Sequence, residues 1–222
     1  KLNDIIALVR AFQNSPQIFI LDTIIKDGFA TANLNLNFDK KGKIKENYKI
    51  EGTVVKVKLD IPNGLELKNL SFNFDIEKNK YSLKRIDTEL NDIKITSPVI
   101  EIKKKKNLFF VSGQFLNEKK NFDIKELKPI FANLFNIIDI QKIEFSSKNK
   151  FSFNLNKNLK FDNFKVESII DLNQLIIFNK ELKLNSYFPN FVDKIKLEKH
   201  KILINYNKDK LNIKGNGNFL LE

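Results

Sequence analysis

The residues able to do acid–base or metal chemistry are few and scattered in this sequence. The stretch RIDTELND gathers Asp87, Glu89 and Asp92, three carboxylates that could surround a hard cation such as Ca²⁺. Carboxylates on alternate positions are more typical of the solvated face of a strand, where they bind nothing. We therefore assign no metal site to this cluster.

Other catalytic motifs are incomplete, because required residues or the required flanking elements are missing from the sequence. The chain has no cysteine and one histidine, His200, which lies between two lysines in a stretch typical of a turn. A histidine-based triad or a two-histidine metal site cannot be built from it. The stretch VSGQF lacks the first glycine of a nucleophile elbow, and no helix follows KGNGNF to receive a phosphate. We expect a protein that is not an enzyme and has no cofactor.

The formal net charge of +12 favours anionic partners, although a lysine-rich and asparagine-rich composition is also what an AT-rich genome encodes. The densest basic run is Lys103, Lys104, Lys105 and Lys106. It is a candidate contact for lipid headgroups or a membrane surface. Alternatively, it is a hairpin turn whose charges deter edge pairing. Nucleic-acid binding needs aromatic rings on the basic face, and most phenylalanines here lie on the opposite face, so we expect no nucleic-acid partner and rank that function last.

The elements that position these residues are mostly strands with one apolar face. In LSFNFDI, the side chains of Leu70, Phe72, Phe74 and Ile76 point one way and the polar ones point the other way. Nearly every other strand candidate repeats this alternation. In the run 44–61 the apolar positions change from even to odd at Val54 and Val55, which predicts a bulge or bend.

Helical spacing predicts two amphipathic helices, at 2–14 and 123–138, each followed by a series of strands. We interpret this as a loose repeat, with a first helix and β-meander at 1–120 and a second at 121–222, forming one continuous sheet. No apolar run is long enough for a membrane-spanning helix. Because the chain contains no methionine, we expect it to be an excerpt from a longer or processed protein.

Two helices cannot cover the apolar face of about a dozen strands. The sheet must fold onto itself as a sandwich, close as a barrel, or curl into an open trough whose apolar face takes a guest. Gly215 and Gly217 stand at odd-numbered positions, as the apolar residues of their strand do, so both glycines lie on its apolar face. The missing side chains leave room for a guest or for close packing of a partner chain. We predict a mainly β antiparallel meander curled into an open groove, with a β-sandwich as the alternative.

The stretch 48–115 resembles the AsmA-like/TamB-type family of long bacterial envelope proteins. The resemblance rests on a turn motif at Pro62, Gly64, Leu67 and Leu70, on the strand FFVSGQF and on LNIKGNGNF. It implies a periplasmic protein whose parent chain is anchored in the inner membrane, with a curved apolar β-groove that moves phospholipids towards the outer membrane. Family motifs of this kind specify no catalytic residues.

The function that we expect is therefore passage of phospholipid acyl chains along an apolar groove, driven by non-directional apolar burial. The alternative is a structural or protein-interaction β-sandwich module of the cell envelope. Phospholipid is the expected partner, and outer-membrane or other envelope proteins are further candidates. The predicted groove lining is Leu34, Leu36, Phe38, Leu70, Phe72, Phe74, Ile76, Phe151, Phe153, Leu155, Leu211, Ile213, Gly215, Gly217 and Phe219.

Overall fold

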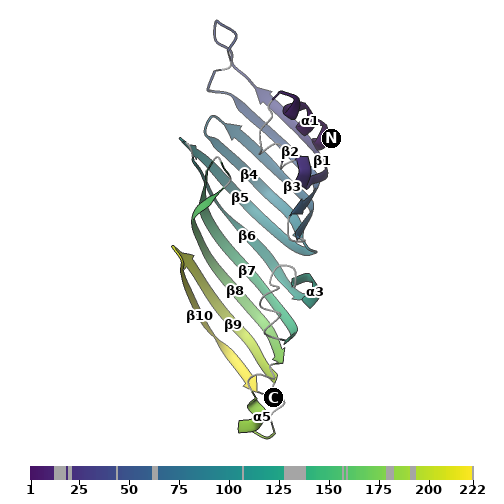
Figure 1. Cartoon of the computed structure of the whole chain (residues 1–222), viewed down its shortest axis with the longest axis vertical. Coiled ribbons are helices and arrows are strands. Elements are labelled where there is room, and N and C mark those ends of the chain that lie inside the picture. Colours follow the sequence, from purple (N-terminus) through teal and green to yellow (C-terminus); the bar gives the residue numbers. More distant parts are fainter. Residues whose placement is uncertain are drawn as a thin grey trace. The chain divides into compact units, whose positions relative to one another are not determined.

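The computed structural model describes residues 1–12, 19, 22–43, 45–61, 65–106, 108–127, 139–156, 158, 160–178, 183–190 and 194–221. Strands dominate the described chain (Figure 1). Their bounds are β1 Ile25–Asn35, β2 Lys49–Ile61, β3 Leu65–Glu77, β4 Lys80–Leu90, β5 Ile93–Lys105, β6 Leu108–Phe122, β7 Asp139–Asn156, β8 Phe161–Phe178, β9 Lys194–Asn207 and β10 Lys210–Leu221.

The ten strands form one sheet in which each strand pairs with its neighbour in sequence, from β1 at one edge to β10 at the other. The pairs whose register is resolved are all antiparallel. The predicted mainly β antiparallel meander is therefore confirmed, and its strand order is open. A sandwich requires two sheets, and the described strands form a single one.

Contacts divide the chain into two compact units. Unit 1 comprises residues 1–115 and 151–164, and unit 2 comprises 116–150 and 165–222. Unit 1 thus holds the first five strands, part of β6 and the hairpin between β7 and β8. The proposed repeat, with a boundary after residue 120, stays a prediction.

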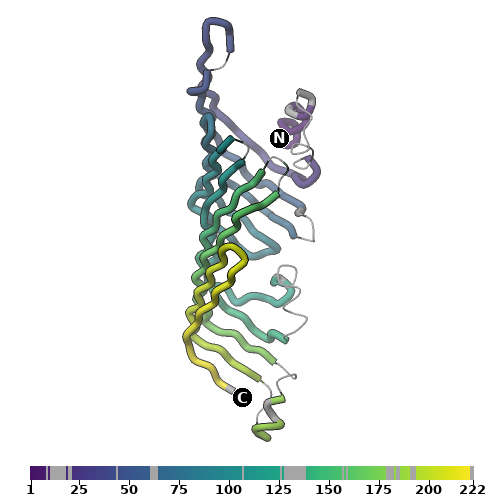
Figure 2. The backbone as a smooth tube through the Cα atoms, turned by 60° about the vertical axis from the view of Figure 1, so that its left-hand side comes forward, coloured from purple at the N-terminus to yellow at the C-terminus, as the bar shows by residue number. Residues whose placement is uncertain are grey.

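The helices are short. Helix α1 (Leu2–Phe12) forms where the apolar spacing predicts it; Ile6 is buried, and the helix packs against β1 (Figure 2). Helix α3 (Ile124–Leu127) begins the second predicted helix, whose remainder at 128–138 lies outside the described residues. The stretch 181–188, which alternation predicts to be a strand, instead contains helix α5 (Leu184–Tyr187). That prediction was wrong.

The predicted bulge in β2 is confirmed. The register between β2 and β3 shifts between Val54 and Val57, and Lys56 has a positive φ of 54°. The Lys56 N–H donates a hydrogen bond to Ser71 Oγ at 3.2 Å, so the amide that leaves the ladder has a partner. Because the bulge adds one residue, the apolar side chains of β2 keep to one face along the whole strand.

The next two strands carry matching irregularities. Asn69 in β3 and Arg85 in β4 also have positive φ angles, and both lie between the pairs Leu67–Leu90 and Phe74–Leu83. In β5, Pro98 stands opposite Arg85, where the ladder is interrupted, so its missing N–H costs no hydrogen bond. These irregularities form a continuous line across β2–β5. At that line the apolar side chains of each strand change once between even-numbered and odd-numbered positions.

Ser71→Ala is expected to lower the free energy of unfolding by about 1 kcal/mol, since it removes the acceptor for the Lys56 N–H at the bulge. Chemical denaturation of the purified protein measures the change. Ser152→Ala, which removes a hydroxyl from a strand position away from this line of bulges, is the matched control. An equal loss in both variants would mean that the Ser71 hydroxyl has no special role at the bulge.

Candidate functional site

The apolar side chains of β2 and β3 meet in cross-strand register on one face of unit 1. Residues opposite each other in an antiparallel pair share a face, and their side chains touch. We call the surface that they form, with its continuation in β1, β4 and β5, the apolar face of unit 1. Its central pairs are Ile50–Ile76, Gly52–Phe74, Val54–Phe72, Val57–Leu70 and Leu59–Leu67.

The same face continues on both sides of this central pair. In β1, Leu34 lies opposite Ile50, and Ala30 lies opposite Val54. On the other side, the register joins β3 to β4 and β4 to β5 through apolar partners. These are Ile76–Tyr81–Ile102, Phe74–Leu83–Ile100 and Leu67–Leu90–Ile93.

Burial along the apolar face is graded. Val54, Val57, Ile86 and Ile93 are buried, and the phenylalanines of β3 are half-buried. Leu34, at the β1 edge, is 62% exposed. The face is thus packed in its middle and open at its edge strand.

Two hydroxyls interrupt the apolar face near the line of bulges. Thr88 is buried and donates a hydrogen bond from Oγ1 to the Lys68 carbonyl oxygen at 3.0 Å. Ser97 is also buried, and its Oγ has no hydrogen-bond partner among the described residues. Sequence reasoning missed both residues, although a lone serine or threonine at an apolar position of an alternating strand is a readable signal.

A cluster of phenylalanine rings extends the apolar surface of unit 1 at the hairpin between β7 and β8. Phe153 lies at its centre, with ring centroids 6.1 Å from Phe151, 5.1 Å from Phe161 and 6.3 Å from Phe164. Phe115 approaches Phe151 at 6.1 Å. The predicted lining residues Phe151 and Phe153 are therefore together, and sequence reasoning missed three of their ring partners.

In unit 2, the three C-terminal strands also align apolar residues across the sheet. Ile170, Ile202 and Gly215 form one row, and Val166, Tyr206 and Leu211 form another. At the β10 edge the side chains of Leu211, Ile213 and Phe219 are about 60% exposed or more (61%, 59% and 66%).

The two glycines of β10 differ in surroundings, although they share parity. A Cβ on Gly215 would lie 3.7 Å from Ile202 Cγ1, an ordinary contact with open space around it. A Cβ on Gly217 would collide with the ring of His200 and lie 2.7 Å from His200 Cα. Gly217 therefore offers no room for a guest. His200 belongs to β9, so the prediction that it lies in a turn was wrong.

The ring contact at Gly217 has counterparts in unit 1. A Cβ on Gly52 would lie 2.5 Å from Phe74 Cζ, and one on Gly113 would lie 3.1 Å from Phe151 Cζ. Each of these strand glycines is covered by a ring from the neighbouring strand. Because these glycines have no side chain, the rings pack directly against the backbone. The rings thereby cover the sheet at these positions without a second layer of structure.

Not every predicted lining residue lies in a strand. Leu36 and Phe38 follow the end of β1, where Phe38 forms an isolated bridge and is 55% exposed. Leu155 lies at the end of β7 and is half-buried. The structure therefore brings the β3 residues and Leu34 together on one face, while Leu36 and Phe38 belong to the connection that follows.

A buried polar network in unit 2 was not predicted. Ser147 Oγ donates to Asn117 Oδ1, and Asn149 Nδ2 donates to Ser147 Oγ at 2.7 Å. Ser147 and Asn149 are buried and share the parity of Phe145 in β7. Buried polar groups are stable only when hydrogen-bonded, and this network satisfies them internally.

The opposite face of unit 1 carries paired charges. Lys84 pairs with Asp75, and Glu101 pairs with both Lys80 (3.4 Å) and Lys103 (3.0 Å). Such a face is solvated and balanced, which fits the alternation in the sequence.

The carboxylates of the RIDTELND stretch are likewise engaged by polar neighbours. Asp92 Oδ1 lies 3.1 Å from Lys68 Nζ, and Glu89 accepts a hydrogen bond from Asn69 Nδ2 at 3.3 Å. Hydrogen bonds from Lys58 and Lys68 hold the pKa of the nearby Glu66 below its usual value. No three metal-ligating side chains gather anywhere in the part of the chain that the structure describes.

The lysine run lies at the hairpin between β5 and β6. Lys103 is ion-paired with Glu101, and the Lys104 N–H donates to the Asn79 carbonyl oxygen at 2.9 Å. Lys105 Nζ stands 5.7 Å from the centroid of the Phe110 ring. Lys106 occupies the turn with a φ of 51°. The run is thus both strand end and turn, with exposed side chains.

Comparison with protein-family models, with curated proteins and with solved structures finds no match for this chain. Among the described residues, no helix has the length and apolar character needed to cross a membrane. The resemblance to AsmA-like/TamB-type proteins therefore stays a prediction from sequence motifs.

Proposed function

We propose that this protein binds phospholipid acyl chains on the apolar faces of its sheet. The bound chains would move along the apolar surface that neighbouring strands form together. The observation that carries the proposal is the cross-strand continuity of apolar side chains in both units, together with their exposure at Leu34, Leu211, Ile213 and Phe219. Contiguous exposed apolar surface of this kind usually marks a binding site.

The chemistry of such a surface suits a chain-like apolar guest. Burial of apolar area stabilises a bound acyl chain by about 25 cal/mol per Å², without directional preference, so one surface can accept lipids of different chain length. Nothing in this mechanism requires a catalytic residue or a cofactor. A passive surface does not determine the direction of lipid movement. That direction must come from a gradient or from another protein.

The place of action that we propose follows from the family resemblance alone. By that resemblance, the protein works in the periplasm, with its parent chain anchored in the inner membrane, and carries phospholipid between the inner and outer membranes of a bacterium. Envelope proteins at either membrane are candidate partners.

Purification without detergent, followed by native mass spectrometry and lipid extraction, tests the proposal. We expect phospholipid to co-purify with the folded chain and to be displaced by an apolar fluorescent dye. A lipid-free chain that binds no such dye would contradict the proposal and would favour the alternative, a structural or protein-interaction module of the cell envelope.

A further inference from the structure

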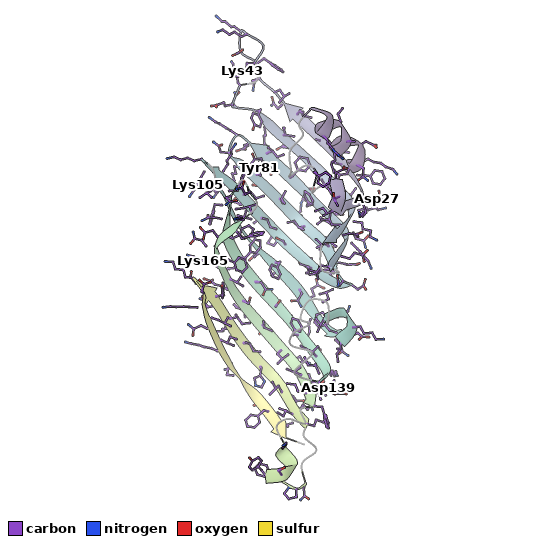
Figure 3. All side chains as sticks on the ribbon, viewed as in Figure 1. Asp27, Lys43, Tyr81, Lys105, Asp139 and Lys165 are labelled. Atoms are coloured by element: carbon purple, nitrogen blue, oxygen red, sulfur yellow. The ribbon has the colours of Figure 1, made fainter. Side chains whose placement is uncertain are left out.

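The connections between strands alternate between the two ends of the sheet, as they must in an antiparallel meander. In unit 1 one end collects the described residues of 36–48, 77–80, 103–108 and 156–161. We call this set the basic rim. Figure 3 shows Lys43, Tyr81 and Lys105 at this end of the strands and Asp27 at the other.

The basic rim carries lysines that unit 1 does not neutralise. Seven of them are exposed and form no ion pair with another described residue; Lys105, also exposed, faces the Phe110 ring. The carboxylate Asp39 is occupied by the backbone N–H groups of Lys41 (2.8 Å) and Lys43 (2.9 Å). The seven are Lys40, Lys41, Lys43, Lys45, Lys104, Lys106 and Lys160.

The opposite end of the same strands is balanced. Glu66 pairs there with Lys58 at 2.6 Å and with Lys68 at 3.1 Å, and Lys68 also reaches Asp92. Lys94 lies 4.0 Å from Asp87. Positive charge in unit 1 is therefore concentrated at one end of its strands, which composition alone does not explain.

Exposed apolar side chains lie among these lysines. Phe161 is 67% exposed and Leu108 is 41% exposed, and Phe38 lies in the same set of connections. Lysines next to exposed phenylalanine and leucine match the chemistry of an anionic bilayer surface, where the charges meet headgroups and the apolar side chains enter the acyl boundary. Nucleic-acid recognition favours arginine, and the chain's two arginines, Arg10 and Arg85, lie outside the rim.

We propose that the basic rim docks unit 1 onto an anionic phospholipid membrane. The rim lysines are separate from the apolar face, so docking through them does not depend on acyl chains being held on that face. Together with the proposed function, it places one end of every strand in unit 1 at the membrane from which lipid would enter or leave.

Sedimentation with vesicles tests the proposal. The full chain is expected to bind vesicles of phosphatidylcholine and phosphatidylglycerol, to ignore vesicles of phosphatidylcholine alone, and to dissociate at high salt. Changing Lys41, Lys43, Lys104 and Lys106 to glutamine should weaken vesicle binding at least tenfold, because each lysine near an anionic surface contributes about 1 kcal/mol. Phe161→Ser should weaken it further.

The matched control changes Lys26, Lys125, Lys148 and Lys201 to glutamine, which removes the same charge from residues that are not part of the rim and should alter binding by less than about twofold. Equal weakening in both sets, no binding by the parent chain, or tighter rim-dependent binding to single-stranded RNA than to vesicles would overturn the proposal. Co-purified lipid, measured in the two four-lysine variants, should be unchanged, because none of these lysines belongs to the apolar face. If no lipid co-purifies with the parent chain, only the proposed binding of acyl chains is contradicted, and not the docking of the rim.

Discussion

Phe74→Asp is expected to destabilise unit 1 by about 3 kcal/mol or more and to abolish lipid loading. The Phe74 ring covers the backbone at Gly52 and has Leu83 as its cross-strand neighbour in β4. Aspartate would remove that cover and place an unpaired charge among half-buried apolar side chains. Chemical denaturation and native mass spectrometry of the purified variant measure the two effects.

Asn73→Asp is the matched control on the other face of the same strand. The orientation of the Asn73 amide that satisfies both neighbours directs its oxygen to Arg85 Nε (3.1 Å) and its nitrogen to Thr53 Oγ1 (3.2 Å). A carboxylate would keep the arginine contact, and threonine can donate to it, so stability should change by less than about 1 kcal/mol. If the control loses as much stability as Phe74→Asp, then the assignment of the two faces is wrong.

The faces of the sheet could be predicted because alternation is a local property of each strand. The bulge in β2 was also readable, since two adjacent valines mark the change of parity. The similar change at Asn69 was missed because Leu67 and Leu70 are separated by two polar residues, so no adjacent pair of apolar residues marks the change. A spacing of three between apolar residues inside an alternating strand is the signal that would have revealed it.

The surroundings of the strand glycines could not be predicted, because they depend on register between strands. Alternation places Gly215 and Gly217 on one face, which is all that a single strand can tell. The register between β9 and β10 shifts between Asn216 and Asn218, and this shift brings His200 rather than an aliphatic residue against Gly217. The same lack of long-range information led the stretch around His200 to be interpreted as a turn.

The contrast between these two glycines gives the second large expected effect. Gly217→Leu should lower the free energy of unfolding by about 1–3 kcal/mol whether or not lipid is bound, because its side chain would overlap the His200 ring and backbone. Neither glycine has a positive φ, so backbone strain does not contribute. Thermal denaturation of lipid-loaded and delipidated protein measures the loss, which should be the same in both.

Gly215→Leu should behave in the opposite way. The nearest atoms to a Cβ at this position are Ile202 Cγ1 at 3.7 Å and the Lys201 carbonyl oxygen at 3.9 Å, so a leucine side chain projects over the apolar surface without a clash. Stability without lipid should stay constant or rise by about 0.4–1 kcal/mol, since the unfolded chain loses conformational freedom. The added side chain would occupy space that an acyl chain uses, so the lipid recovered per folded chain should fall. Gly215→Ala, which meets the same backbone without the bulk, should retain its lipid. A stable Gly215→Leu variant that still carries the parent's full lipid content would remove β10 from the proposed lipid-binding surface.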